Sequence, residues 1–424
     1  MSDFARLWAG FTISRVGSQV TVLALPLAGV LLLGAGATET GLMLAARTAP
    51  SIVAALFIGV WVDRYARRPI LVGTSIASAV VVGSVPVAWA LGSLTLLQLY
   101  VVSFLAGLLW IATDLARGAL LPTLVGRARL VGANSRLQAS DAVASVAGPS
   151  LGGSLVQAIG APLAMAVDAA SFVVSAAFLA SMRARETLRP REAGRHMRHE
   201  IADGLRWMRD HQILFRSTVA IALANIEWFA VQAVLVVYAT RDLALSPAVL
   251  GIALAAIGPF SLVGAALAGP VIGRIGLGPV MILALLLEAV SRLILPFAAG
   301  SEAQAAAVLA LTQALVGLTV PLWTVSSRTL QQAATPDHLL ARVQSATYLV
   351  GFGVAPPAAL GAGLLGDAIG LRPTLLIAGL IAVVAVLYLF FSSVRTFHSV
   401  PDTAASLRTD EVTPRSVDEQ RAID

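Results

Sequence analysis

Residues 59–70 read GVWVDRYARRPI and place one aspartate and three arginines between two long apolar segments. Charged residues make up only 12% of the 424-residue chain, so this concentration needs a physical reason. A short basic connection between two apolar segments is typical of a cytoplasmic loop that joins two membrane-spanning helices. The stretch therefore predicts a membrane protein. It also indicates that the two helix ends joined by this loop face the cytoplasm.

Apolar segments long enough to cross a membrane recur along the whole chain, which is 58% hydrophobic with a mean hydropathy of +0.85. A spanning helix needs about 20 apolar residues, and in lipid only helices and closed barrels satisfy every backbone polar group. The alternating pattern of a barrel is absent. We therefore predict an all-α membrane protein with twelve transmembrane helices, at residues 7–33, 41–61, 70–91, 94–116, 137–158, 162–182, 213–238, 247–268, 278–298, 304–327, 343–365 and 372–392.

The basic residues orient these helices. All 29 are arginine, and with a cytoplasmic N-terminus nearly all of them lie in cytoplasmic segments, whereas only Arg241 and Arg372 lie outside. The positive-inside rule then places both termini in the cytoplasm. Arginine without lysine, in a chain rich in alanine and glycine, suggests a GC-rich bacterium and hence its inner membrane. Because the arginines belong to loops, no nucleic-acid partner is expected. Arg15, Arg47 and Arg292 remain inside apolar segments.

The longest internal connection divides the helices into two sets of six. We predict an N-terminal six-helix bundle (1–182), a cytoplasmic linker (183–212), a C-terminal six-helix bundle (213–392) and a disordered cytoplasmic tail (393–424). From about residue 197 the linker has apolar residues at helical spacing, which indicates an amphipathic helix lying on the cytoplasmic surface, although a plain solvated linker is the alternative. The predicted apolar face comprises Met197, Ile201, Leu205 and Met208. Gly59, Arg64 and Pro69 recur as Gly269, Arg274 and Pro279, which favours two repeats.

The opening stretch places Asp63 and three arginines, Arg64, Arg67 and Arg68, in the turn between helices 2 and 3. Gly59 allows close helix contact and the aspartate can accept hydrogen bonds at a helix N-terminus, while the arginines alone are also explained by orientation. The pattern resembles the signature of the major facilitator superfamily, whose members have twelve helices in two bundles. The resemblance implies that Asp63 caps the helix beginning near residues 341–343, and that Arg64 or Arg67 pairs with Asp114, as a latch between the bundles in the outward-open state.

Helix 5 carries a second motif, formed by Gly148, Pro149, Gly152 and Gly153. Glycines one turn apart allow tight helix packing, and the proline can bend the helix. This sequence resembles the helix-5 motif of exporters in the superfamily, except that Ala144 replaces a glycine. Further phrases, among them Ser14 to Gly17 and Asp168 to Phe172, resemble the branch related to enterobactin and macrolide exporters. Helix 4 lacks the arginine that many proton-coupled relatives carry within it.

Charged residues at membrane depth are the best candidates for proton or substrate binding, because each costs roughly 2.5–3.5 kcal/mol to insert. Glu227 lies in the middle of helix 7 and either exchanges a proton, binds a cationic substrate or neutralises a buried arginine such as Arg15. Glu288 and Arg292, four residues apart, suit a structural ion pair. The remaining candidates are Arg15 and Asp141, whose helices could meet in the N-terminal half, and Asp168, for which a structural role is favoured.

These features together predict a secondary active transporter that exports an amphipathic small molecule, such as a drug or siderophore, by proton antiport. The expected partners are this substrate and the lipid bilayer, and we expect a monomer with no cofactor and no metal. A metabolite importer of the same fold is the alternative within transport. A membrane-embedded enzyme is disfavoured because no spanning segment contains histidine and the chain has no cysteine, and a sensor because no soluble domain is present.

Overall fold

The computed structural model describes residues 2–51, 65–126, 129–183, 197–336 and 339–397, and every regular element in these ranges is helical. Gly59, Asp63 and Arg64 lie outside them, as does the tail from residue 398. The N-terminal half contains α1 (Asp3–Leu33), α2 (Ala37–Thr48), α4 (Arg67–Ala90), α5 (Leu96–Val125), α6 (Leu130–Ile159) and α7 (Ala161–Ala180).

The remaining helices form a connecting element and the C-terminal half. They are α8 (Met197–Asp210), α9 (Gln212–Val237), α10 (Pro247–Ala255), α11 (Ile257–Ile275), α12 (Leu277–Ile294), α13 (Glu302–Ala333), α14 (Leu340–Gly353), α15 (Ala355–Ile369) and α16 (Leu371–Phe390). A π-helical turn, η2 (Tyr238–Asp242), follows α9, and two 3-10 turns, η3 (Leu295–Phe297) and η4 (Ser393–Thr396), follow α12 and α16.

Eleven helical segments within the described ranges are long and apolar enough to cross a membrane. Two of them are broken helices, since α10 and α11 form one span and α14 and α15 form another. These spans coincide with eleven of the predicted twelve. The twelfth, 41–61, overlaps α2 and continues into residues outside the description, so the structure is consistent with twelve helices.

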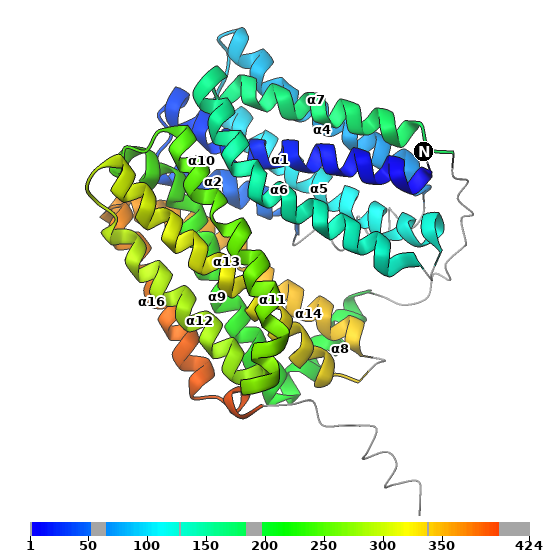
Figure 1. The fold of residues 1–424 in the computed structure, drawn as a ribbon, viewed down its shortest axis with the longest axis vertical. Helices are drawn as coiled ribbons and strands as arrows, with labels where there is room; N and C mark the ends of the chain where they lie inside the picture. Colours follow the sequence, from blue (N-terminus) through cyan, green and yellow to red (C-terminus); the bar gives the residue numbers. More distant parts are fainter. Residues whose placement is uncertain (1, 52–64, 127–128, 184–196, 337–338, 398–424) are drawn as a thin grey trace, which may run out of the picture.

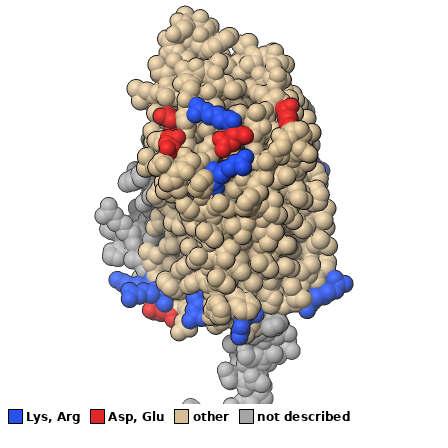
Figure 2. All heavy atoms as spheres, turned by 90° about the vertical axis from the view of Figure 1, so that its left-hand side faces the viewer, with Lys and Arg blue, Asp and Glu red and all other residues tan. Residues whose placement is uncertain are grey.

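Charged side chains are distributed as expected for a protein embedded in lipid. On the face shown in Figure 2, Arg, Asp and Glu residues gather in one group of both signs and in a mostly basic row at the bottom, and the surface between them carries none. Water solvates charge at both membrane boundaries, whereas hydrocarbon does not. The protein is therefore a multi-pass membrane protein.

The two halves approach each other at one end and diverge toward the other (Figure 1). At the end where α2 and α10 lie, one buried apolar cluster includes residues of both halves, such as Leu27 and Ala37 with Leu250 and Ala359. Toward the opposite end each half has its own cluster, around Leu120 in the N-terminal half and around Leu330, Ala385 and other residues in the C-terminal half. We call the first end the closed end.

The backbone repeats itself at a spacing of 210 residues. Gly34 ends α1 with a φ of 67°, and its counterpart Ala244 has a φ of 50°, a conformation that side chains other than glycine rarely adopt. Gly160 and Gly370 have φ values of 83° and 93°, and each directly precedes the next spanning helix. Each of these two glycines ends an Ala-Ile-Gly sequence. The two halves are therefore structural copies.

The helix α8 packs on the C-terminal half rather than standing free on the surface. Its Met208 is buried with Leu214 of α9 and Val343 of α14, and Leu205 packs against the same group. Gly204 permits the close crossing, because a methyl group there would overlap the carbonyl oxygen of Arg342. The predicted apolar face thus contacts protein at Leu205 and Met208. α8 therefore packs directly against the first turn of α14.

Candidate functional site

Four hydrogen bonds join the two halves at the closed end. The guanidinium of Arg241, from η2, donates to the carbonyl oxygens of Gly34 and Ala35 at 2.9 and 2.8 Å. The carboxylate of Asp367, on α15, accepts from the backbone amides of Ala37 and Thr38 at 3.1 and 2.9 Å. These amides form the N-terminus of α2, where the helix dipole favours a negative charge.

Two pairs of glycines bring the halves into close contact next to these four hydrogen bonds. Gly153 of α6 and Gly251 of α10 face each other so closely that a methyl group on either would lie 2.9 Å from the Cα atom of the other. Gly41 of α2 and Gly363 of α15 form the same kind of crossing, and a methyl group on Gly41 would lie 3.0 Å from the Cα atom of Gly363. The two crossings are related by the repeat of 210 residues.

The glycine motif of the fifth predicted spanning helix, which is α6 in the structure, therefore contributes to two interfaces. Gly148 and Gly152 fit against Gln19 and Val20 of α1, inside the N-terminal half, whereas Gly153 contacts the other half. Adjacent residues on a helix point about 100° apart, which explains the division. α6 remains one continuous helix through Pro149, so the proline does not break it.

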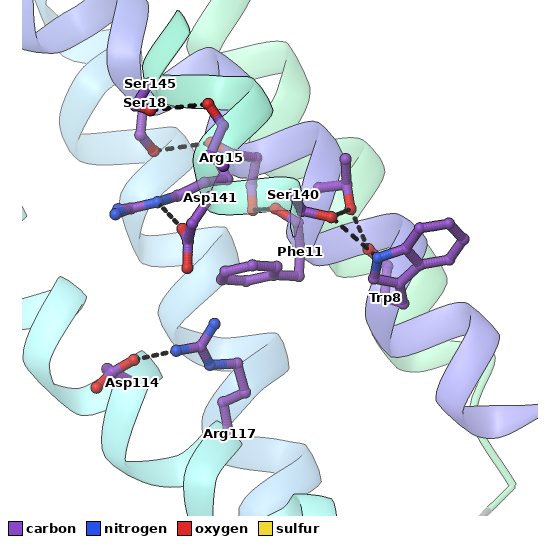
Figure 3. Close-up of polar contacts among 12 residues, drawn as sticks. Trp8, Phe11, Arg15, Ser18, Asp114, Arg117, Ser140, Asp141 and Ser145 are labelled. Carbon is purple, nitrogen blue, oxygen red and sulfur yellow. Dashed lines mark hydrogen bonds and ion pairs between the residues drawn. The ribbon is translucent and has the colours of Figure 1, made fainter. Parts of the chain in front are cut away.

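A polar group in the N-terminal half lies where α1, α5 and α6 meet (Figure 3). Nε of Arg15 contacts Oδ1 of Asp141 at 2.5 Å, so the structure brings these two candidates together. Both side chains remain about one quarter exposed, at 28% and 26%. A small cavity of about 90 Å³ lies beside Asp141 and is lined by Arg117 and Asn134 among others. This ion pair is thus accessible to a small polar ligand.

Asp168, by contrast, is tied into the contact between α1 and α7. It is 1% exposed and accepts a hydrogen bond from the hydroxyl of Thr21 at 2.5 Å. Ser171 donates to it at 3.1 Å, and Gly17 leaves room for both residues. Gly17 and Asp168, which belong to two separate sequence motifs, therefore lie in contact with each other. Arg47 of α2 interacts electrostatically with Asp168 and Arg15.

The C-terminal half holds a second charged cluster, which is sealed from solvent. Arg292 of α12 is 1% exposed, and its Nε pairs with the carboxylate of Glu227 on α9. The same guanidinium contacts Glu288 at 3.5 Å and lies 5.3 Å from the ring of Trp228. Glu227 is 0% exposed and Glu288 is 7% exposed. Glu227 thus pairs with an arginine of its own half and not with Arg15.

Aromatic side chains form a row beside this cluster. Tyr348 and Phe352 on α14 are stacked with ring centroids 4.7 Å apart, and Phe229 on α9 contacts Phe352 edge to face. Tyr348 and Phe352 are 43% and 38% exposed. Tyr348 also interacts electrostatically with Asp114 of α5, which places this row opposite the N-terminal half.

Two residues of the expected latch, Asp114 and Arg68, make contacts within their own half in this structure. Asp114 pairs with Arg117, three residues later on α5 (Figure 3). Arg68 donates to the carbonyl oxygens of Leu179 and Ala180 at 3.3 and 2.5 Å and so caps the end of α7. The expected contact of Asp63 with the start of α14 falls outside the described residues.

Several residues of these sites, among them Arg47, Arg241 and Asp367, were absent from the sequence-based candidates. Arg47 was predicted only to lie within an apolar segment. That position alone makes an arginine a candidate functional residue. Arg241 and Asp367 lie at helix ends, where charged residues are common. The sequence of a single helix does not show that these two side chains contact the other half. The sequence does contain a clue for Asp367, because it lies within GLLGDAIG, the counterpart of GSLVQAIG in helix 5.

Comparison with known proteins agrees with this geometry. The multidrug efflux pump Tap of Mycobacterium tuberculosis is 27% identical over 371 residues, covering 86% of this chain and 87% of Tap. The Tap protein of Mycolicibacterium fortuitum is 31% identical over 185 residues, covering 42% and 44%. Among solved structures, the nucleoside transporter NupG has a TM-score of 0.76 at 11% identity, covering 92% of this chain and 98% of NupG.

A bacterial homologue of the iron transporter ferroportin, solved in its inward-facing state, has a TM-score of 0.74 at 18% identity, covering 92% of this chain and 98% of that one. These two structures support the fold alone. The family described as transmembrane secretion effector matches residues 1–422, nearly the whole sequence. The chain therefore belongs to this family of major facilitator superfamily transporters, and it is a transporter rather than an enzyme.

Proposed function

We propose that this protein exports an amphipathic, drug-like molecule across a bacterial inner membrane by alternating access, with inward proton movement as the energy source. The relative that aligns over most of the chain is named as a multidrug efflux pump, and the family is one of secretion. The stacked rings of Tyr348 and Phe352 suit the apolar part of such a molecule. The accessible pair of Arg15 and Asp141 suits its polar part.

The arginine distribution supports a cytoplasmic location for both termini and the basic loops, which means that the closed end, with Arg241 and Asp367, faces outward. The halves are joined by an apolar cluster and hydrogen bonds at that end and have separate clusters toward the other. This arrangement fits an inward-open state that loads its substrate from the cytoplasm. Because one chain supplies both halves, we propose that a monomer is sufficient.

The main observation in support of proton coupling is the buried cluster of Glu227, Glu288 and Arg292. Two carboxylates share one guanidinium in a buried site, so ionising both leaves a net negative charge where desolvation is costly. Either a proton or the positive charge of a substrate can neutralise this surplus. Competition between the two for the same carboxylates would couple proton entry to substrate release, which is the requirement for antiport.

Transport into everted vesicles tests this mechanism. With an acidic vesicle interior, the wild-type protein should accumulate a hydrophobic cation such as tetraphenylphosphonium, and collapsing the pH gradient should abolish accumulation. Glu227→Gln keeps the shape of the side chain but cannot ionise, so gradient-driven uptake should fall to the level of vesicles without the protein. Glu302→Gln is the matched control, since Glu302 accepts a backbone hydrogen bond from Ser246 far from the cluster.

Two results would contradict the proposal separately. If the pH gradient does not change the transport of any hydrophobic cation or siderophore that is tested, the proposal of proton antiport is wrong. If Glu227→Gln transports as the wild type does while the gradient still matters, the coupling site lies elsewhere, and Asp141 becomes the next candidate.

A further inference from the structure

A cavity of about 560 Å³ lies between the start of α9 and the end of α16 in the C-terminal half. It is lined by Arg216, near the start of α9, and by residues at the end of α16, namely Val384, Leu387, Tyr388, Phe391 and Ser392. None of these residues takes part in the candidate site described above. The cavity therefore needs a separate explanation.

The apolar wall of the cavity continues a stripe of exposed side chains along α16. Leu380, Val384, Leu387 and Phe391 are 56%, 52%, 49% and 77% exposed and recur every three or four residues. In a spanning helix, such a stripe faces lipid, because no other apolar phase is available to cover it. A hydrocarbon chain lying along the stripe would lead directly into the cavity.

The polar side of the cavity is formed by Arg216 and Tyr388. Within the ranges that the structure describes, the guanidinium of Arg216 makes no hydrogen bond or ion pair, and neither does the hydroxyl of Tyr388. The two groups do interact electrostatically with each other. A half-buried guanidinium next to a phenol offers several donors to one acceptor, and a phosphate oxygen is the acceptor that fits this arrangement.

The depth of these residues matches that of a lipid headgroup. Arg216 lies one turn inside the start of α9, which begins at Gln212, and Tyr388 lies near the end of α16 at Phe390. Arginine and tyrosine at the ends of spanning helices lie at the level of the phosphates. A soluble substrate would instead be expected between the two halves, whereas the residues that line this cavity all belong to the C-terminal half.

We propose that this cavity is a phospholipid site, with the lipid phosphate bound by Arg216 and Tyr388 and one acyl chain lying on Val384, Leu387 and Phe391. The site needs only that the protein is embedded in a membrane, so it stands independently of the substrate and the energy source. An anionic phospholipid such as phosphatidylglycerol should bind best, because its headgroup adds no positive charge that would repel Arg216.

Thermal unfolding of the purified full-length protein in detergent, titrated with phosphatidylglycerol, tests the proposal. Arg216→Gln should raise the half-saturating lipid concentration about fivefold to tenfold, as expected for the loss of one phosphate contact. Tyr388→Phe, which removes only the hydroxyl, should raise it about twofold to fivefold. Arg274→Gln is the control, because Arg274 is an arginine that likewise lies near a helix end, in the last turn of α11, but is exposed and lines no described cavity.

Inorganic phosphate and additional detergent serve as separate arms, and neither should stabilise the protein. Wild-type affinity in both Arg216→Gln and Tyr388→Phe would overturn the proposal. Equal weakening in Arg216→Gln and Arg274→Gln would show a general charge effect and would also overturn it. If Arg216→Gln does not fold, native mass spectrometry of Tyr388→Phe decides, since an unchanged amount of copurified phospholipid would contradict the site.

Discussion

Replacing Asp367 with alanine should weaken the closed end and shift the protein toward its other state. Asp367 accepts hydrogen bonds from the amides of Ala37 and Thr38, at 3.1 and 2.9 Å, and these amides belong to the opposite half. Alanine removes both acceptors and leaves the N-terminus of α2 to water. The change therefore penalises the state with the closed end joined and has little effect on a state in which these segments are apart.

The size of the effect follows from these two contacts. Loss of an N-terminal cap costs about 0.5–2 kcal/mol, and a single hydrogen bond contributes about 0.5–1.5 kcal/mol net. Asp367 is exposed, so its charge is screened and the electrostatic part is small. Roughly 1–2 kcal/mol remains, which corresponds to about a fivefold to thirtyfold change in the ratio of the two states.

Distances between spin labels measure this ratio directly, and the chain has no cysteine to interfere. Cysteines introduced at Val131, which is 80% exposed at the start of α6, and at Gln332, which is exposed near the end of α13, would report the separation of the halves opposite the closed end. The short distance should gain population in Asp367→Ala. A minor state of about 1% in the wild type would rise to roughly 5–25%.

Glu302→Ala is the matched control, because Glu302 accepts a hydrogen bond from the amide of Ser246 at 2.8 Å within a single half. It removes an acidic contact next to a helix start at the same end without touching the interface. If Asp367→Ala leaves the distance distribution unchanged, or if Glu302→Ala shifts it equally, the cross-half contacts of Asp367 do not control the equilibrium.

Two further substitutions test the packing and the buried charges. Gly153→Ala should force α6 away from α10 and lower stability by about 1–3 kcal/mol in denaturant unfolding, whereas Gly132→Ala, in open space on the same helix, should behave as wild type. Arg292→Gln should leave Glu227 buried without its partner and lower stability by about 3–5 kcal/mol in denaturant unfolding, and adding Glu227→Gln should restore part of the loss. Equal unfolding of the single and double variants would contradict the ion pair.

The sequence predicted the fold well because the membrane constrains it so strongly. Hydropathy alone placed the helices, since a lipid environment requires about 20 apolar residues for each span and permits no exposed polar backbone. The breaks at Ala256 and Val354, within single spans, were not predicted. Such breaks leave the average hydropathy unchanged, so a pattern of apolar residues does not report them.

Pairing between charged groups was harder to predict than their depth. Arg292 and Glu288 are four residues apart on one helix, so their contact was readable from spacing. The partner of Glu227 was not, because Arg292 reaches it from another helix, and sequence order does not say which helices are neighbours. The contact of Arg15 with Asp141 was anticipated only as a possible meeting of two helices.

The duplicated halves do not use their two crossings in the same way. Gly41 with Gly363 and Gly251 with Gly153 are equivalent by the repeat, yet only the first crossing carries an acid at the closed end, since the counterpart of Asp367 is Gln157. The sequence motif shows the same bias, because the counterpart of Asp63 is Gly273.

The pair of α2 and α15 is therefore joined by the hydrogen bonds of Asp367 as well as by its glycine contact, whereas the described residues of α6 and α10 make no hydrogen bond to each other. An interface held by hydrogen bonds at a helix terminus can open and re-form without distorting its surroundings, because water replaces the lost partners. A glycine crossing depends on close backbone packing, which is retained only if the helices roll without separating. We therefore expect the crossing of α2 and α15 to be the one that opens during transport, with the crossing of α6 and α10 acting as the pivot.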